Sequence, residues 1–237
     1  MKPGAAAILA TARQRLEALP LVAIAVVAGG LFAFIEIAEE VVENETHAID
    51  ERVLLWLRSP ADRQDPLGPR WFEAMVADIT SLGSAFTLTF LTLAVGGWLL
   101  LAGRRNAGYL LLVSVAGGTL LSTALKSFFD RPRPDLVAHG TDVFTASFPS
   151  GHAMLSAVTY LTLGALVMRV SGRRALKAYT LTLSILLTLM IGVSRVYLGV
   201  HWPSDVVAGW AVGAAWATLA WLFAFWLQQR GDIEPPS

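Results

Sequence analysis

The stretch RRNAGYLLLVSVAGGTLLSTALK, residues 104–126, holds 20 uncharged residues between basic side chains. A helix that crosses the hydrocarbon core of a bilayer needs about 20 mainly apolar residues. Five other stretches also lack Asp, Glu, Lys and Arg for 16 residues or more, namely 18–35, 79–103, 143–168, 178–194 and 206–229. The sequence therefore predicts an all-α, polytopic membrane protein that forms a single domain over residues 1–237, with six transmembrane helices at roughly 19–36, 80–103, 106–126, 151–169, 177–195 and 203–228.

The composition fits this interpretation and excludes several kinds of chemistry. Hydrophobic residues make up 55% of the chain and charged residues only 15%, whereas an ordinary soluble domain carries about 25% charged residues. The alternative is a soluble protein with six buried helices, but too little polar surface would remain to cover them. The chain has no cysteine, so it cannot form a disulfide, a thiolate metal site or a cysteine nucleophile.

Basic residues are distributed unevenly between the two sides of the predicted bundle. If the N-terminus is cytoplasmic and the six helices alternate, ten of the 18 basic residues fall inside, together with three of the 18 acidic residues. The inside residues are Lys2, Arg13, Arg15, Arg104, Arg105, Arg169, Arg173, Arg174, Lys177 and Arg230, with Glu17, Asp232 and Glu234. Because positive charge in short loops marks the cytoplasmic side, we expect both termini in the cytoplasm. The connections 126–152 and 195–205 then lie on the outer side.

The long polar connection 36–78 contains one further predicted helix. In AIDERVLLWLRSP, residues 48–60, the apolar side chains of Ile49, Val53, Trp56 and Leu57 fall on one helical face. Such a helix either lies at the membrane interface, with Trp56 at the depth of the lipid headgroups, or packs against the bundle as a short amphipathic helix. The sequence leaves both arrangements open.

Three cations cluster where the third predicted transmembrane helix ends. Lys126 closes that helix, and Arg131 and Arg133 each precede a proline. These side chains could simply reach toward lipid headgroups, but basic flanks are expected on the opposite side of the membrane. Three cations so close would repel one another unless an anion lay among them, and arginine offers a planar fork that matches phosphate oxygens. The cluster therefore predicts a phosphate-binding site.

The stretch PSGH, residues 149–152, directly precedes the fourth predicted transmembrane helix. Ser150 is a preferred N-cap residue, and Gly151 lets the backbone approach a ligand closely. Free N–H groups at a helix N-terminus attract an anion. A lone histidine in such a first turn is more often structural than catalytic. Beside three cations on the same side of the membrane, however, His152 is a candidate to act on the bound anion.

The stretch SRVYLGVHWPSD, residues 194–205, connects the last two predicted helices. Asp205 follows His201 by four residues, so a hydrogen bond between the two side chains is expected. A carboxylate that holds one ring nitrogen leaves the other nitrogen free as a nucleophile. Taken singly, the pair could be a helix-start cap and Arg195 a headgroup contact. Together they would leave two histidines and four cations converging without a purpose.

These residues resemble the three motifs of the type 2 phosphatidic acid phosphatase superfamily, in the same order and with the same spacing. The motifs are K-x6-RP from Lys126, PSGH from Pro149 and SR-x5-H-x3-D from Ser194. Within this family the chain resembles the bacterial phosphatidylglycerophosphatase B and undecaprenyl diphosphate phosphatase enzymes. Vanadium haloperoxidases share such motifs, but they are soluble, and six transmembrane helices argue against that class.

The resemblance implies a role for each motif residue. His201 would attack phosphorus and form a phosphohistidine, Asp205 would orient His201, and His152 would protonate the leaving oxygen and later assist water. The phosphoryl oxygens would be held by Lys126, Arg133, Ser150, Gly151 and Arg195. Arg131 lies outside the motif and would be an outer support of the site or a headgroup contact. Because the cluster lacks grouped carboxylates, we expect no metal and no other cofactor.

The sequence thus predicts a lipid phosphatase at the outer face of a bacterial inner membrane, with its site on the periplasmic or extracellular side. Its expected substrates are undecaprenyl diphosphate, phosphatidate or phosphatidylglycerophosphate, and its expected partners are membrane lipids and no nucleic acid. Two alternatives remain. A phosphotransferase would pass the phosphoryl group to an acceptor other than water. A non-catalytic binder or transporter of lipid phosphates would need the cations but not the His201–Asp205 pair.

Overall fold

The computed structural model describes residues 5–140 and 145–230, and in these ranges the chain is helical and contains no strand. Lys2, Asp232 and Glu234, which contribute to the predicted charge asymmetry, lie outside the described residues. The helices are α1 (Ala5–Val42), α2 (His47–Trp56), α3 (Arg70–Ser81), α4 (Ala85–Leu101), α5 (Arg105–Phe129), α6 (Gly151–Val170), α7 (Arg174–Tyr197) and α8 (Pro203–Arg230). The predicted all-α class is therefore confirmed.

Five helices within the described ranges are long and apolar enough to cross a membrane, and α3 with α4 forms a sixth candidate. The sequence predicts one span over 80–103, but the structure bends by 45° between α3 and α4. The bend follows from a new helix start at Ser84, whose hydroxyl oxygen accepts a hydrogen bond from the Thr87 N–H at 3.1 Å. The depth of each span in the bilayer stays a prediction.

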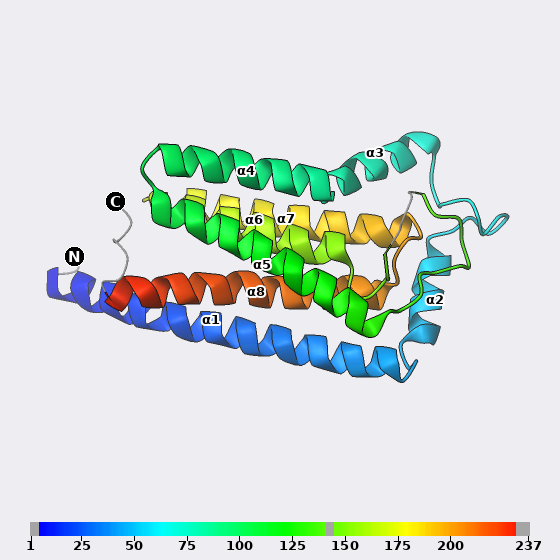
Figure 1. Cartoon of the computed structure of the whole chain (residues 1–237), viewed down its shortest axis with the longest axis horizontal. Helices are drawn as coiled ribbons and strands as arrows, with labels where there is room; N and C mark the ends of the chain where they lie inside the picture. The colour runs from blue at the N-terminus through cyan, green and yellow to red at the C-terminus, as the bar shows by residue number, and fades with distance from the viewer. Residues whose placement is uncertain (1–4, 141–144, 231–237) are drawn as a thin grey trace.

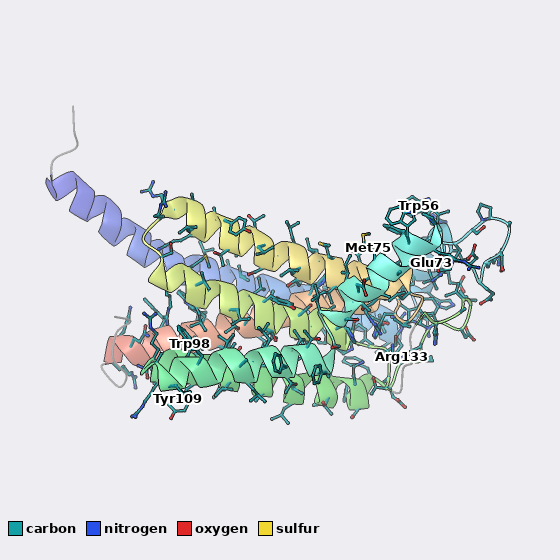
Figure 2. All side chains as sticks on the ribbon, turned by 90° about the horizontal axis from the view of Figure 1, so that it is seen from above. Trp56, Glu73, Met75, Trp98, Tyr109 and Arg133 are labelled. Atoms are coloured by element: carbon teal, nitrogen blue, oxygen red, sulfur yellow. The ribbon has the colours of Figure 1, made fainter. Side chains whose placement is uncertain are left out.

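The long helices run side by side, and α2 lies across one end of the bundle (Figure 1). The start of α1 and the end of α8 are both at the opposite end (Figure 1), on different sides of the bundle (Figure 2). On α2, the apolar side chains of Ile49 and Trp56 are exposed, whereas Asp50 and Leu54 are buried against the bundle. The face predicted to be apolar therefore points away from the bundle, and the polar Asp50 lies on the side that faces the protein.

Large apolar side chains cover the outside of the bundle. Phe86 and Leu101 on α4 and Leu120 on α5 are all largely exposed. Water-soluble monomers rarely expose apolar patches larger than a few hundred Å². Aromatic side chains lie toward both ends, with Trp98 and Tyr109 at one end and Trp56 at the other (Figure 2). Such aromatic side chains favour the two membrane–water interfaces, so this surface is that of a membrane protein.

Helices α6 and α8 approach each other through glycine. A Cβ atom at Gly209 would lie 2.8 Å from the Ser150 carbonyl oxygen, and one at Gly213 would lie 2.6 Å from the Met154 carbonyl oxygen. Two glycines four residues apart on one helix allow backbones to come this close. Their contact fixes the start of α6 against the first turns of α8, where the PSGH and H-x3-D motifs lie.

The glycine contact predicts that Gly213→Ala destabilises the protein, because the new Cβ would collide with main-chain atoms of α6 that cannot move aside. Overpacking of this kind costs about 1–3 kcal/mol. Gly97→Ala on α4 is the matched control, since a Cβ there meets nothing within 4 Å. Thermal unfolding in detergent should show a lower midpoint for Gly213→Ala and an unchanged or higher midpoint for Gly97→Ala. Equal midpoints for the two variants would contradict the close contact.

Candidate active site

The predicted motif segments meet at the end of the bundle that carries α2. The connection after α5 pairs with the turn before α8 through Gly140 N–H to the Leu198 carbonyl at 2.9 Å and Trp202 Nε1 to the Pro132 carbonyl at 3.2 Å. The Ser150 N–H donates to the Asp205 carbonyl at 2.9 Å. These main-chain contacts bring the K-x6-RP, PSGH and SR-x5-H-x3-D motifs to one place.

His201 and Asp205 form the expected hydrogen bond, with 3.3 Å between Nδ1 of His201 and Oδ2 of Asp205. Both side chains are almost completely buried. The same carboxylate oxygen accepts hydrogen bonds from the Trp202 N–H at 2.9 Å and from the Ser147 hydroxyl. Because an ionised carboxylate only accepts hydrogen bonds, Nδ1 of His201 carries the proton.

The second ring nitrogen of His201 points to Arg133, with 3.1 Å between Nε2 and Nη1. A guanidinium only donates, so Nε2 is the unprotonated nitrogen and its lone pair faces the cation. Arg133 is held in place by the carbonyl oxygens of Thr145 at 2.8 Å and Val200 at 2.6 Å. Both contacts of the imidazole thus favour the same neutral tautomer.

The other two predicted cations come from the ends of α5 and α7. Lys126 Nζ donates to the Ala146 carbonyl at 2.5 Å, and the charges of Arg133, Asp205 and Arg195 act on it. Arg195 donates through Nη1 to the Thr80 hydroxyl at 3.1 Å. Its buried Nε has no hydrogen-bond partner within the described part of the chain. Arg195 therefore retains an N–H that could donate a hydrogen bond to an anion.

The PSGH segment begins α6 beside this group of cations. Ser150 is buried and its hydroxyl oxygen accepts from the Ala153 N–H at 3.5 Å, so it is the N-cap that the sequence predicts. A Cβ at Gly151 would lie 3.4 Å from Cε of Lys126, which shows how near the lysine passes to the helix start. His152 lies in the first turn, within electrostatic range of Lys126 and His201. It has no hydrogen bond to residues 5–140 or 145–230.

For His201 and Arg133, which lie in the connections between helices, burial is the main cause of the pKa shifts. Burial is the main cause that lowers the pKa of His201 to about 3; the hydrogen bond to Asp205 opposes this effect, and the charges of Arg133 and Lys126 add to it. Burial also lowers the pKa of the Arg133 guanidinium, whose ordinary value is so high that it keeps its charge at neutral pH. The site therefore combines a neutral histidine with charged donors.

Three supporting residues were not predicted from the sequence. Ser147 bonds Asp205, Thr80 bonds Arg195, and Asp50 of α2 bonds Arg131. Ser147 and Thr80 leave no pattern that would single them out. Asp50 lies four residues before Leu54 and shares its helical face, but the burial of that face is known only from the structure. For Arg131 the sequence left open an outer support of the site or a headgroup contact. The structure pairs its guanidinium with two carboxylates, which favours the first interpretation.

An apolar groove of about 480 Å³ opens beside this site, between the ends of α1 and α5. Its lining includes Phe34, Ile35, Ala38, Val42 and Phe129, with Glu39 and Glu43 beside them. The Phe129 ring packs edge-on against Phe148 with 4.9 Å between ring centroids. Because Phe148 directly precedes the PSGH segment, a groove-lining ring packs against the residue next to this motif. Across the described ranges, no group of three His, Cys, Asp or Glu side chains is arranged to hold a metal.

Comparison with known proteins gives consistent matches. The profile of the PAP2 superfamily matches residues 107–229. A phosphatidylglycerophosphatase B from Bacillus subtilis is 31% identical over 146 residues, which are 60% of this chain and 70% of that protein. An undecaprenyl-diphosphatase from Sulfolobus acidocaldarius is 30% identical over 115 residues, 46% of this chain and 52% of that protein. The crystal structure of a transmembrane PAP2-type phosphatidylglycerolphosphate phosphatase from Bacillus subtilis superposes with a TM-score of 0.72 at 27% identity, covering 83% of this chain and 94% of that structure.

The helical bundle has the fold of a transmembrane PAP2-type phosphatase, and the relatives that the chain matches are lipid phosphatases. The match to the family profile covers more than half of the chain. The chain belongs to the PAP2 superfamily, which confirms the resemblance seen in its three motifs.

The buried neutral His201 predicts a loss of stability in mild acid. An unfolded histidine takes up a proton below about pH 6.5, whereas the folded His201 stays neutral down to a pKa of about 3. The unfolded state binds more protons in this window, so stability falls as the pH falls, by at most about 2 kcal/mol at about pH 5. Between about pH 7 and about pH 5, the thermal unfolding midpoint of His201→Gln should therefore fall by less than that of the wild type.

The control for this measurement is His47→Gln, because the His47 side chain is more than half exposed. This variant should keep the pH dependence of the wild-type midpoint. If His201→Gln and the wild type lose stability equally over the same pH range, His201 is not held neutral by burial.

Proposed function

We propose that the protein hydrolyses lipid phosphates or diphosphates through a phosphohistidine on His201, without a metal. The observation that carries the proposal is the orientation of one imidazole. Its Nδ1 is 3.3 Å from the Asp205 carboxylate, and its Nε2 is 3.1 Å from the Arg133 guanidinium. A phosphoryl group that entered beside Arg133 would meet the lone pair of Nε2.

In the first step Nε2 of His201 forms a bond to phosphorus while the bond from phosphorus to the leaving oxygen breaks. The imidazole becomes positively charged, since it keeps the proton on Nδ1, and Asp205 stabilises that charge. Negative charge on the transferring group is stabilised by Lys126, Arg133 and Arg195, together with Ser150 and the Gly151 N–H at the start of α6.

His152 supplies the proton that the leaving oxygen needs, and in the second step it takes a proton from the attacking water. Two features support this assignment. His152 lies in electrostatic range of His201, and its ring makes no hydrogen bond to the described residues that would compete with the substrate. Water then breaks the bond between nitrogen and phosphorus and releases inorganic phosphate.

The proposed substrates are undecaprenyl diphosphate, phosphatidate and phosphatidylglycerophosphate. The names of the relatives support lipid phosphates of these kinds. The apolar groove supports a substrate with hydrocarbon tails, because it opens among exposed apolar side chains. Its Phe34 and Phe129 rings also pack against Phe148, which directly precedes the PSGH segment.

We place both termini in the cytoplasm and the site on the periplasmic or extracellular side of a bacterial inner membrane. Positive charge at the opposite end of the bundle supports this orientation. Arg104 and Arg105 lie at the start of α5, and Arg173, Arg174 and Lys177 lie at the start of α7. Both connections are far from the end that carries α2 (Figure 1).

Phosphate release from a panel of lipid phosphates, with EDTA present, tests the function directly. Purified full-length protein in detergent should release phosphate from long-chain substrates, and glycerol 3-phosphate, which lacks tails, should need a higher concentration. His201→Ala should abolish release and remove the acid-labile phosphoprotein that wild type forms. Binding without release would favour a transporter or binder, and transfer to a non-water acceptor would favour a phosphotransferase. A strict requirement for added Mg²⁺ would contradict the mechanism.

The general-acid role of His152 predicts a dependence on the leaving group. A p-nitrophenolate leaves without a proton, whereas the alkoxide of a lipid needs one. His152→Ala should therefore slow phosphohistidine formation much less with p-nitrophenyl phosphate than with a lipid alkyl phosphate. Rapid-quench measurement isolates this first step from hydrolysis of the intermediate, in which His152 acts again. Equal losses with the two substrates would assign His152 to phosphate binding instead.

The proposed orientation predicts which end of the bundle is accessible outside the cell. Ala138 lies in the exposed connection before α6, and Gly172 lies in the exposed turn between α6 and α7. Because the chain has no cysteine, single cysteine substitutions give a clean background. Ala138→Cys should react with a membrane-impermeant thiol reagent in intact cells, and Gly172→Cys should react only after lysis. The reverse pattern would place the site in the cytoplasm.

A further inference from the structure

A buried chain of charges connects α2 to the candidate catalytic carboxylate. The Arg131 guanidinium lies between two acids, with 2.6 Å from Nη1 to Oδ1 of Asp205 and 2.9 Å from Nη2 to Oδ2 of Asp50. Asp50 and Asp205 are almost completely buried, and the Arg131 side chain is 12% exposed. The guanidinium also lies over the Trp202 ring, 5.6 Å from its centroid. Both terminal nitrogens of Arg131 are therefore engaged inside the protein.

Asp50 also holds the start of α8, although it lies 154 positions earlier in the chain. Its Oδ1 accepts a hydrogen bond from the Ser204 N–H at 2.9 Å, and its Oδ2 accepts one from the Ser204 hydroxyl at 2.5 Å. Ser204 is the second residue of α8, so its N–H is one of the donors that a helix start leaves unpaired. A side chain of α2 thus does for α8 what an N-cap residue does for its own helix.

The geometry constrains how the Asp205 carboxylate can turn. Arg131 holds Oδ1, so Oδ2 is the oxygen that remains directed at Nδ1 of His201. A planar guanidinium can bridge two carboxylates in one fixed arrangement, which a flexible ammonium group cannot do. The three charges sum to one negative charge, which lies beside the imidazole that becomes positive when it takes the phosphoryl group.

We infer that Asp50 and Arg131 are positioning residues, which act through Asp205 to fix the tautomer and orientation of His201. The inference rests on the proposed function for its effect on turnover. Asp50 lies outside residues 107–229, where the family profile matches, so α2 contributes to a site that the family motifs do not include. Both terminal nitrogens of Arg131 bind the two carboxylates, so Arg131 does not hold the substrate phosphate.

Adjacent acids on α2 offer a matched pair of variants. Asp50→Asn removes the charge that faces Arg131 but keeps an oxygen that can accept from the Ser204 N–H. Glu51→Gln makes the same chemical change at a position that is more than one third exposed and paired with His47. Both variants are made in the full-length protein, and their thermal midpoints in detergent are measured first. Arg131→Lys serves as a second variant, because it keeps the charge and loses the fork.

The first readout needs no substrate. Nitrogen-15 NMR of the imidazoles reports which ring nitrogen carries the proton, and His201→Gln assigns the His201 signals among the four histidines. Wild type and Glu51→Gln should show His201 protonated on Nδ1 alone. Asp50→Asn and Arg131→Lys should show a mixture of tautomers. An unchanged His201 spectrum in both variants, while they remain folded, would overturn the inference.

The second readout is turnover of dioleoyl phosphatidate, with kcat and KM measured separately. Asp50→Asn should lower kcat by about 10- to 100-fold, a range typical of outer partners that orient a histidine, with KM little changed. If Asp50 acts through Arg131, then Asp50→Asn should have no further effect in an Arg131→Gln background. Additive losses, or a rise in KM with kcat unchanged, would overturn the inference. If the variants change the tautomer of His201 as expected but the wild type releases no phosphate, the positioning role stands and only the proposed function is refuted.

Discussion

The site depends on keeping one carboxylate ionised inside the protein. Asp205 has no exposed surface, and an ionised carboxylate removed from water costs several kcal/mol unless it is paired and hydrogen-bonded. Its partners are the Trp202 N–H, the Ser147 hydroxyl, His201 and Arg131. They come from the connection after α5 and from the turn before α8, so compensating this charge requires the two segments to meet. The proposed nucleophile, His201, is oriented by the same contacts that make the buried charge tolerable.

Two cations of the site, Lys126 and Arg133, are held by main-chain oxygens rather than by acids. Lys126 donates to the Ala146 carbonyl, and Arg133 donates to the carbonyls of Thr145 and Val200. A carbonyl dipole compensates a positive charge only in part, so the cluster keeps a strong attraction for an anion. The negative charge of Asp205, which lies near the cluster, is turned toward His201 and Arg131. The donors are therefore in place before a phosphoryl group arrives, which is the arrangement that favours catalysis by preorganised charge.

The sequence predicted what is encoded locally and missed what is encoded over long distances. The charge-free stretches gave the long helices, and the four-residue spacing gave the hydrogen bond between His201 and Asp205. The bend at Ser84 was missed because the run 79–103 carries no charged residue that would mark a break, while the break comes from an N-cap and from the packing of Gly83 against Ile191. The pairing of Asp50 with Ser204 leaves no local pattern, and Asp50 cannot be told from its neighbour Glu51 until the fold places one of them inside.

The contact between α6 and α8 has a consequence for how enzymes of this kind can diversify. His152 and His201 stand at the starts of two helices that touch backbone to backbone at Gly209 and Gly213. The spacing between the two histidines is therefore set by main-chain packing, and side-chain substitutions elsewhere do not alter it. The faces of α1 and α5 that line the groove carry no such restriction. Under the proposed function, substitutions in the groove could suit lipids with different tails, while the placement of the two histidines was inherited unchanged.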